Sequence, residues 1–412
     1  MKNLILIANI SLLALSTSFI NLPLNQKSFY ADKVDIFSDT SVADIKSYYS
    51  NLTSGLKGDD LLSSLQSVLE TSQTKLAKST STTWTNYLLL DRDWVNDPLT
   101  SEESQNQKWK EDNVICKPLY ESTFTFIKAN SPGNYVNREH VFPKSYGFGN
   151  DSSSTFLPYA GTDMQNLHMG EATNNQSGHN NYAFGNVQSK SSSKAITSSI
   201  SKEVTGYLGT GLNGIPVYEP RDEDKGDIAR TIFYMAARYH TYEADQDNSP
   251  ALKLSDSPAK IYENKTTIIA SETKDNPCEY GMLTDLLKWN ILDPVDDHEI
   301  HRNNLCYNAV QKNRNPFIDY PSWADIAFKD STSGIDLSLT PSQVGVSSGS
   351  EEKPDDSDEG SGNFFEDFFN SKYYVYVIIG GLVLIAFLIS FFSSRAKKKK
   401  AKKTNDKNQK KE

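Results

Sequence analysis

The chain has 412 residues, of which 37% are hydrophobic and 11% aromatic, so it can bury a core and is not a disordered chain. Its three cysteines exclude a disulfide-built small fold and a thiolate metal cluster, so any bound metal would use oxygen and nitrogen ligands. The formal net charge of -10 means that nonspecific electrostatic attraction alone would not recruit a polyanion. A nucleic-acid partner would therefore require local basic residues or bound cations.

The N-terminal end differs in composition from the body of the chain. Residues 4–20 form an apolar run behind Lys2, and the polar stretch that follows ends at Ala31. This pattern predicts a secretory signal peptide over residues 1–31, with an uncleaved N-terminal anchor as the alternative. Both interpretations place the body outside the cell.

The C-terminal end predicts a stalk, a membrane span and a cytoplasmic tail. Residues 341–370 are rich in Gly, Ser, Asp and Glu, which is typical of a solvated linker. Residues 373–392 are apolar and, at about 1.5 Å per residue, long enough to span a bilayer as one helix. Residues 393–412 are rich in Lys, which the positive-inside rule places in the cytoplasm. Without the apolar segment, the same basic run would be interpreted as a nucleic-acid-binding tail.

The body, residues 32–340, is predicted to be one α+β domain that is mixed and largely helical. Apolar residues recur at helical spacing in segments 42–72, 226–240, 281–290 and 297–312. Polar and apolar residues alternate, as in short strands, at 122–127 and 135–142. Polar segments without a sustained period, which predict surface loops, are 97–112 and 188–204.

The most informative residues for chemistry are Glu139 and His140, which adjoin on a strand-like segment and so point to opposite faces of it. Further along, segments 162–168 and 174–185 are dense in carboxamides and His. Mg²⁺ prefers a few oxygen ligands and retains several waters, so one Glu carboxylate and one Asn carbonyl are a sufficient protein contribution. A neutral His beside that ion can take a proton from water.

In these residues the chain resembles the bacterial endonuclease I family of periplasmic and secreted nucleases, whose catalytic unit is a ββα-metal or His-Me finger. The resemblance covers roughly residues 44–328 and begins from Arg138 to Pro143. Further matching blocks occur at Tyr48-Tyr49, Gly55 to Gly58, Asp91 to Asp93, Tyr218 to Pro220, Lys225 to Arg230, Phe233 to Tyr239, Trp289, Asp293 to Val295, Glu299 to Arg302 and Gln311 to Asp319.

The resemblance implies that His140 is the general base, Glu139 a metal ligand and Asn175 the second ligand. The implied cofactor is a divalent cation of the Mg²⁺ type, with Ca²⁺ or Mn²⁺ as alternatives, and no small-molecule cofactor is expected. The sequence departs from the family pattern after Asp163, because the usual Arg a few residues past the ligand Asn is missing. Asn174, Asn175 or Asn181 could each take the ligand position.

Arginine use points to the residues that contact phosphate. Eight of the 42 basic residues are Arg, and those in the body lie in or beside the matching blocks, which fits a need for a rigid bidentate group. Arg230 and Arg238 lie on an apolar-striped helix and are predicted to be structural. Arg138, next to the base, is predicted to act in catalysis. The residues predicted to contact substrate are Lys144, Asn174, His179 and Asn181.

The sequence as a whole predicts a membrane-anchored extracellular endonuclease that hydrolyses DNA, and RNA as a second substrate, to 5′-phosphate products. Its purpose would be the degradation or scavenging of external nucleic acid. The alternative is a catalytically inactive surface protein, either a nucleic-acid-binding protein or an adhesin, on the same scaffold. Metal-dependent cleavage distinguishes the two.

Overall fold

The structure, a computed structural model, describes residues 40–76, 80–94, 113–121, 125–128, 135–147, 159–243, 249–257, 268–269 and 273–345. All of these belong to one compact unit, Met1–Ser350. Among them, no helix has both the length and the apolar character that a membrane crossing needs. The predicted signal peptide, apolar segment 373–392 and basic tail lie outside the described residues, as do most of the stalk and the predicted loop 97–112.

Two helices form the N-terminal part of the described chain. Helix α3 (Val42–Tyr48) begins at Ser41, whose side chain accepts from the backbone N–H of Asp44 while the Asp44 carboxylate accepts from the Ser41 N–H, a capping box. Helix α4 (Gly58–Ser72) buries a stripe of leucines. The predicted helical segment 42–72 is therefore confirmed as two helices, separated by residues 49–57.

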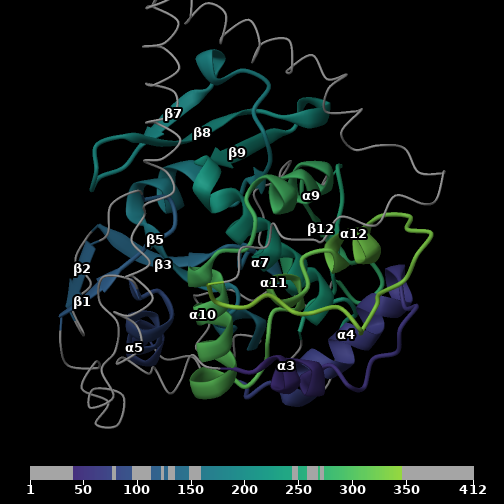
Figure 1. Ribbon diagram of the computed structural model, residues 1–412. Coiled ribbons are helices and arrows are strands. Elements are labelled where there is room, and N and C mark those ends of the chain that lie inside the picture. Colours follow the sequence, from purple (N-terminus) through teal and green to yellow (C-terminus); the bar gives the residue numbers. More distant parts are fainter. Residues whose placement is uncertain are drawn as a thin grey trace, which may run out of the picture. The chain divides into compact units, whose positions relative to one another are not determined.

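Helix α7 (Lys225–Arg238) is the central helix of the unit (Figure 1), and nearly all of its residues are buried. A helix that is buried on every side must be covered by several neighbours; here α4, α9 and α11 pack against it. The other described helices are α5 (Thr80–Leu90), α9 (Leu283–Leu292), α10 (Asp297–Leu305) with the π-helical turn η8 (Cys306–Val310), α11 (Pro316–Asp319) and α12 (Trp323–Phe328).

A four-stranded sheet, of which Figure 1 labels β7, β8 and β9, has the order β6-β9-β8-β7. Its strands are β6 (Ala183–Phe184), β7 (Lys194–Thr197), β8 (Val204–Thr210) and β9 (Pro216–Pro220). The predicted loop over 188–204 is wrong for β7, which pairs antiparallel with β8. Because β7 is an edge strand with most of its side chains exposed, its Ser/Lys-rich surroundings carry no alternating pattern.

The remaining strands form two-stranded ladders. Their pairs are β1 (Asn113–Cys116) with β2 (Thr125–Lys128), β3 (Val136–His140) with β5 (Leu167–Glu171), β10 (Leu252–Leu254) with β12 (Cys278–Tyr280), and β11 (Ile268–Ile269) with β4 (Tyr146–Gly147). Helices and strands pack together in one large hydrophobic cluster and two smaller ones, so the described unit is a mixed α+β domain, as predicted.

Buried ion pairs join segments that are distant in sequence. Arg230, fully buried on α7, donates from Nε and Nη2 to the two carboxylate oxygens of Glu299, both over 2.6 Å. Arg238, also on α7, pairs with Glu243. The predicted structural role of these two arginines is confirmed. Removing one partner of such a pair leaves a buried charge without compensation.

Candidate active site

The two adjacent residues Glu139 and His140 end strand β3. In the antiparallel ladder with β5, Glu139 lies opposite His168 and His140 lies opposite Leu167. Directly after β5 the chain enters a helical turn that becomes the π-helix η3 (Asn174–His179). The ladder therefore fixes Glu139 and His140 and places the carboxamide-rich η3 next to them.

The imidazole of His140 is oriented by the backbone. Its Nε2 lies 2.9 Å from the carbonyl oxygen of Gly161, in the 3₁₀ turn η2 (Tyr159–Thr162). A carbonyl oxygen can only accept, so Nε2 carries the hydrogen and, in the neutral ring, Nδ1 keeps the lone pair. The contact thus selects one tautomer, in which Nδ1 is the basic atom.

Glu139 is buried, with 2% of its surface exposed, and two donors converge on one of its oxygens. The Tyr120 hydroxyl donates to Oε1 over 2.7 Å, and Nδ1 of His179 lies 2.5 Å from the same atom. Burial raises the pKa of the Tyr120 hydroxyl well above its usual range, and the Glu139 charge raises it further, so the hydroxyl stays protonated. Within the described part of the chain, no donor contacts Oε2 of Glu139.

The side-chain amide of Asn175 is also held in one orientation. Its Nδ2 donates to the backbone carbonyl of Arg138 over 3.2 Å and to Oδ1 of Asn137 over 2.6 Å. Since the carbonyl of Arg138 accepts only, the nitrogen of the amide must face it, and Oδ1 of Asn175 is the oxygen left for other ligands.

A glycine allows Glu139 and Asn175 to approach each other. A Cβ atom at Gly170, on β5, would lie 2.9 Å from Cβ of Glu139 and 3.7 Å from Nδ2 of Asn175. Oε2 of Glu139 and Oδ1 of Asn175 are one carboxylate oxygen and one amide oxygen, a set that suits a hard cation which keeps most of its waters. Within the described ranges, no group of three or more His, Cys, Asp or Glu could hold a metal ion.

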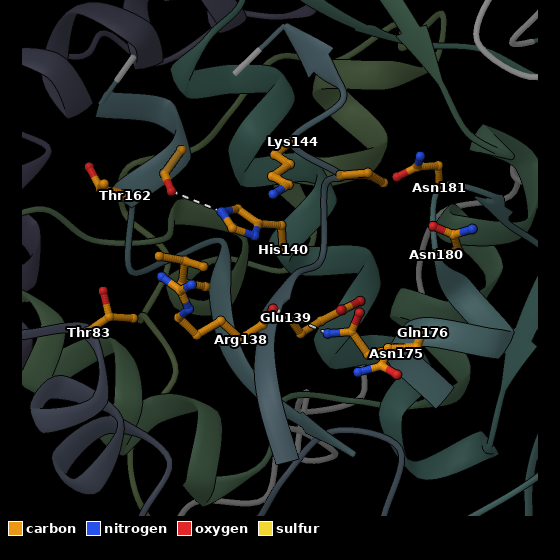
Figure 2. Close-up of a pocket in the computed structure, with 13 residues that line it drawn as sticks. Thr83, Arg138, Glu139, His140, Lys144, Thr162, Asn175, Gln176, Asn180 and Asn181 are labelled. Carbon is orange, nitrogen blue, oxygen red and sulfur yellow. Dashed lines mark hydrogen bonds between the residues drawn. The ribbon is translucent and has the colours of Figure 1, made fainter. Parts of the chain in front are cut away.

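A pocket of about 500 Å³ surrounds these groups (Figure 2). The lining residues include Arg138, Glu139, His140, Lys144, Asn175 and Asn181, which are all residues predicted from the sequence. Gln176, Asn180, Thr83 and Thr162 complete much of the wall. Gln176 and Asn180 belong to the carboxamide-rich stretch that pointed to the site, whereas nothing in the sequence around Thr83, on α5, indicated that it would line the pocket.

Arg138 differs from the arginines of the buried ion pairs. Each of those arginines is held by a carboxylate; the pairs are Arg221–Asp224, Arg230–Glu299, Arg238–Glu243, Arg302–Asp91 and Arg314–Asp319. Arg138 is exposed at the pocket, and no carboxylate of the described residues pairs with it. Its guanidinium is therefore available for an anion, which the bidentate geometry of Arg favours.

Two residues predicted to contact substrate are not brought to the pocket wall. Asn174 and His179 are both fully buried. The amide of Asn174 is fully used: Nδ2 donates to Glu171 over 2.6 Å and to Thr205 over 2.8 Å, and Oδ1 accepts from the Tyr218 hydroxyl over 2.6 Å. Asn174 thus anchors η3 beneath the pocket, and His179 contacts Glu139 from behind.

Comparison with known proteins identifies the family. The model of the family described as Endonuclease I matches residues 58–322. An extracellular ribonuclease of Bacillus amyloliquefaciens is 35% identical over 288 residues, which cover 69% of this chain and 79% of that protein. An extracellular ribonuclease of Bacillus subtilis (strain 168) is 33% identical over 285 residues, covering 69% of this chain and 78% of that protein. No solved structure matches. The match to the family model spans most of the chain and includes every residue of the pocket, so the chain belongs to the endonuclease I family.

Proposed function

We propose that the protein is an extracellular endonuclease that hydrolyses phosphodiester bonds of RNA and DNA with the help of a divalent cation. The observation that carries this proposal is that one pocket is lined by the oriented His140, by Glu139 and Asn175 with their side-chain oxygens, and by the exposed Arg138. General base, cation site and anion site are the parts that phosphodiester hydrolysis requires.

In the proposed reaction, Nδ1 of His140 accepts a proton from the attacking water, and the bond from Nε2 to Gly161 keeps the ring in place as its charge changes. Arg138 and Lys144 bind the phosphate and stabilise the charge that develops on its oxygens. Glu139 and Asn175 would hold the cation, which supplies Lewis-acid stabilisation of the phosphate and of the leaving oxygen.

We further propose that β3, β5 and η3 correspond to the ββα-metal finger. The support is their order: two antiparallel strands, of which the first carries Glu139 and His140, are followed directly by a helical turn that carries Asn175. The third element is short and π-helical in this chain. Its buried residue Asn174 ties it to Glu171 and Thr205 through hydrogen bonds of 2.6 and 2.8 Å.

RNA is included as a substrate because both relatives described above are named extracellular ribonucleases. The pocket offers cationic and amide groups, which can contact a phosphate or a sugar hydroxyl of either nucleic acid. Degradation of external nucleic acid is the cellular role we propose. A role of this kind fits the predicted export of the body and anchoring through residues 373–392.

The test of the enzymatic proposal is cleavage of plasmid DNA and of RNA by the full-length chain in mild detergent, with Mg²⁺ or with EDTA. His140→Ala is the inactivating variant, and His240→Ala, outside the pocket, is its matched control. We expect cleavage that requires metal, is lost in His140→Ala and persists in His240→Ala. Binding of nucleic acid without cleavage under Mg²⁺, Mn²⁺ and Ca²⁺ would instead support the inactive binding protein.

Anchoring is tested separately by fractionating cells that produce the full chain or a chain ending at residue 370. The full chain should sediment with membranes, and the shortened chain should appear in the medium. Equal release of both would contradict the anchor.

A further inference from the structure

We propose that Tyr120 is a positioning residue that, together with His179, fixes the Glu139 carboxylate so that Oε2 faces the cation. The inference deepens the proposed function and rests on it. Both donors use Oε1, and among the described residues none uses Oε2. Oε1 is therefore held by the protein, and Oε2 is the oxygen that would bind the cation.

The Tyr120 side of this arrangement is rigid. The Tyr120 backbone has a φ of 67°, in the left-handed region, and its N–H donates to Oδ2 of Asp224 over 2.9 Å. Arg221 in turn holds Asp224 through two bonds, of 2.6 and 2.8 Å. The Tyr120 ring packs edge-on against the Tyr218 ring, with centroids 5.5 Å apart. The hydroxyl is thus delivered to Glu139 from a backbone that tertiary contacts hold in a sparsely populated conformation.

The His179 side is equally constrained. Its ring stacks on Phe184 with centroids 4.1 Å apart, and its Nε2 lies 2.9 Å from the Tyr280 hydroxyl. The same hydroxyl donates its hydrogen to the carbonyl of Tyr182 over 2.8 Å, which holds Tyr280 in place. The contacts with Phe184 and Tyr280, on the side of the ring away from Glu139, therefore fix the ring plane and keep Nδ1 opposite Glu139.

These contacts oppose rotation of the carboxylate. Swinging the Glu139 carboxylate out of this position would break a buried hydrogen bond with Tyr120 and another with His179. If Tyr120 loses its hydroxyl, the carboxylate gains orientations that do not suit the cation. Partners of metal ligands typically contribute about 10- to 100-fold in metal affinity or activity, which sets the size of the expected effect.

The experiment compares Tyr120→Phe with Tyr234→Phe in the full-length chain. Tyr234 is the matched control because it too is a buried tyrosine whose hydroxyl donates to a buried carboxylate, that of Asp163, over 2.8 Å, and it does not line the pocket. Binding of Mn²⁺ is measured directly by electron paramagnetic resonance, without substrate, and the Mg²⁺ concentration for half-maximal cleavage is measured in parallel. Thermal unfolding reports the structural cost of each variant.

We expect Tyr120→Phe to weaken Mn²⁺ binding about tenfold or more, with a matching rise in the Mg²⁺ requirement and near-normal cleavage at saturating Mg²⁺. Tyr234→Phe should lose stability to a similar degree and keep the wild-type Mn²⁺ affinity. Equal Mn²⁺ affinity in wild type and Tyr120→Phe would overturn the inference. If Tyr120→Phe does not fold, His179→Phe, which keeps a ring against Phe184, must show the same weakening of Mn²⁺ binding for the inference to stand.

Failure of the underlying proposal gives a different result. Glu139→Gln should abolish the Mn²⁺ site if Glu139 is a ligand. If Glu139→Gln binds Mn²⁺ as the wild type does, both the cation site and the inference are wrong. If only Tyr120→Phe is without effect, the cation site stands and the positioning role alone is rejected.

Discussion

Nε2 of His140 donates to the backbone carbonyl oxygen of Gly161 over 2.9 Å, which joins the end of β3 to η2 across the pocket. Because the acceptor belongs to the main chain, no substitution of a neighbouring side chain can remove it. The fold therefore determines that Nδ1 is the basic nitrogen of His140. A loss of cleavage activity on replacing His140 can then be attributed to the lost proton transfer.

Replacing His140 by Ala should lower the cleavage rate by about 10²- to 10⁴-fold, the usual contribution of a general base, and leave nucleic-acid binding nearly unchanged. Added imidazole should restore part of the activity, since it can enter the space left by the ring. Cleavage of a labelled oligonucleotide measures the rate, and fluorescence anisotropy measures binding. A variant with full activity would exclude His140 as the base.

Replacing Arg138 by Ala should weaken substrate binding and reduce its dependence on salt. One lost phosphate contact lowers the slope of log K against log salt concentration by about 0.7 for single-stranded and 0.9 for double-stranded nucleic acid. Titrations at several salt concentrations measure the slope. Lys253→Ala, an exposed cation on β10 that does not line the pocket, is the control and should leave the slope unchanged; a similar change there would mean that the effect is general.

Replacing Arg230, which forms a buried ion pair with Glu299, should affect stability and not substrate binding. Arg230→Met should lower the free energy of unfolding by at least about 3 kcal/mol, because it leaves the Glu299 carboxylate buried without its partner. Arg138→Met, the same exchange at an exposed guanidinium, should change stability by less than about 0.5 kcal/mol. Urea unfolding of both variants measures the difference. If Arg230→Met were as stable as Arg138→Met, leaving Glu299 without its partner would cost no stability and the prediction would be wrong.

Stability should fall in mild acid because of His298. Its partial burial and, next, the charge of Lys117 lower the pKa of His298 to about 3, although Asp296 acts in the opposite direction. In the unfolded chain the imidazole binds a proton near pH 6.5, so between that pH and about 3 the unfolded state binds more protons. The stabilisation is complete above pH 6.5 and is lost as the pH falls.

The measurement for His298 is urea unfolding from pH 7 to pH 4 in wild type and in His298→Gln. Carboxylates that titrate in this range are common to both proteins, so their effects cancel in the difference. The stability of the variant should fall less steeply with decreasing pH. Parallel curves would show that His298 is not buried in its neutral form.

Gly170 gives a prediction about the cation site. In Gly170→Ala, the added Cβ would lie only 2.9 Å from Cβ of Glu139, which forces the carboxylate away from Asn175. We expect a higher Mg²⁺ requirement for cleavage while far-ultraviolet circular dichroism stays unchanged. An unaltered Mg²⁺ requirement would mean that the two side chains need not approach each other.

The sequence named many of the residues that line the pocket, but not the residue Tyr120 that supports one of them from outside it. Glu139 and His140 are informative because adjacent residues of opposite chemistry on a strand are rarely needed for packing. Sequence alone left Asn174 and Asn181 as alternatives to Asn175, and Asn174 in particular is hard to separate from Asn175 because neighbours on a helical turn differ only in the direction they face. The structure brings Asn175 and Asn181 to the pocket and buries Asn174. Tyr120 gave no signal, because its role depends on a backbone conformation and on contacts with Asp224 that are distant in sequence.

The same limit applies to the fold. Helix α4 could be predicted because a buried leucine stripe is written into one segment. Strand β7 could not, because an edge strand owes its existence to its partner β8 and leaves most of its own side chains in solvent.

The alternation of β3 has a consequence for which sequence changes the family can accept. Neighbouring residues of a strand face opposite sides, so deleting or inserting one residue within Val136–His140 would exchange the positions of the cation ligand and the base. Length changes between Gly147 and Tyr159 alter neither the pairing of His140 with Leu167 nor the order of the residues that contact His140, and so leave both proposed functions in place. Related chains should therefore vary in length after the Glu-His pair and keep the number of residues before it, back to the start of the strand, constant.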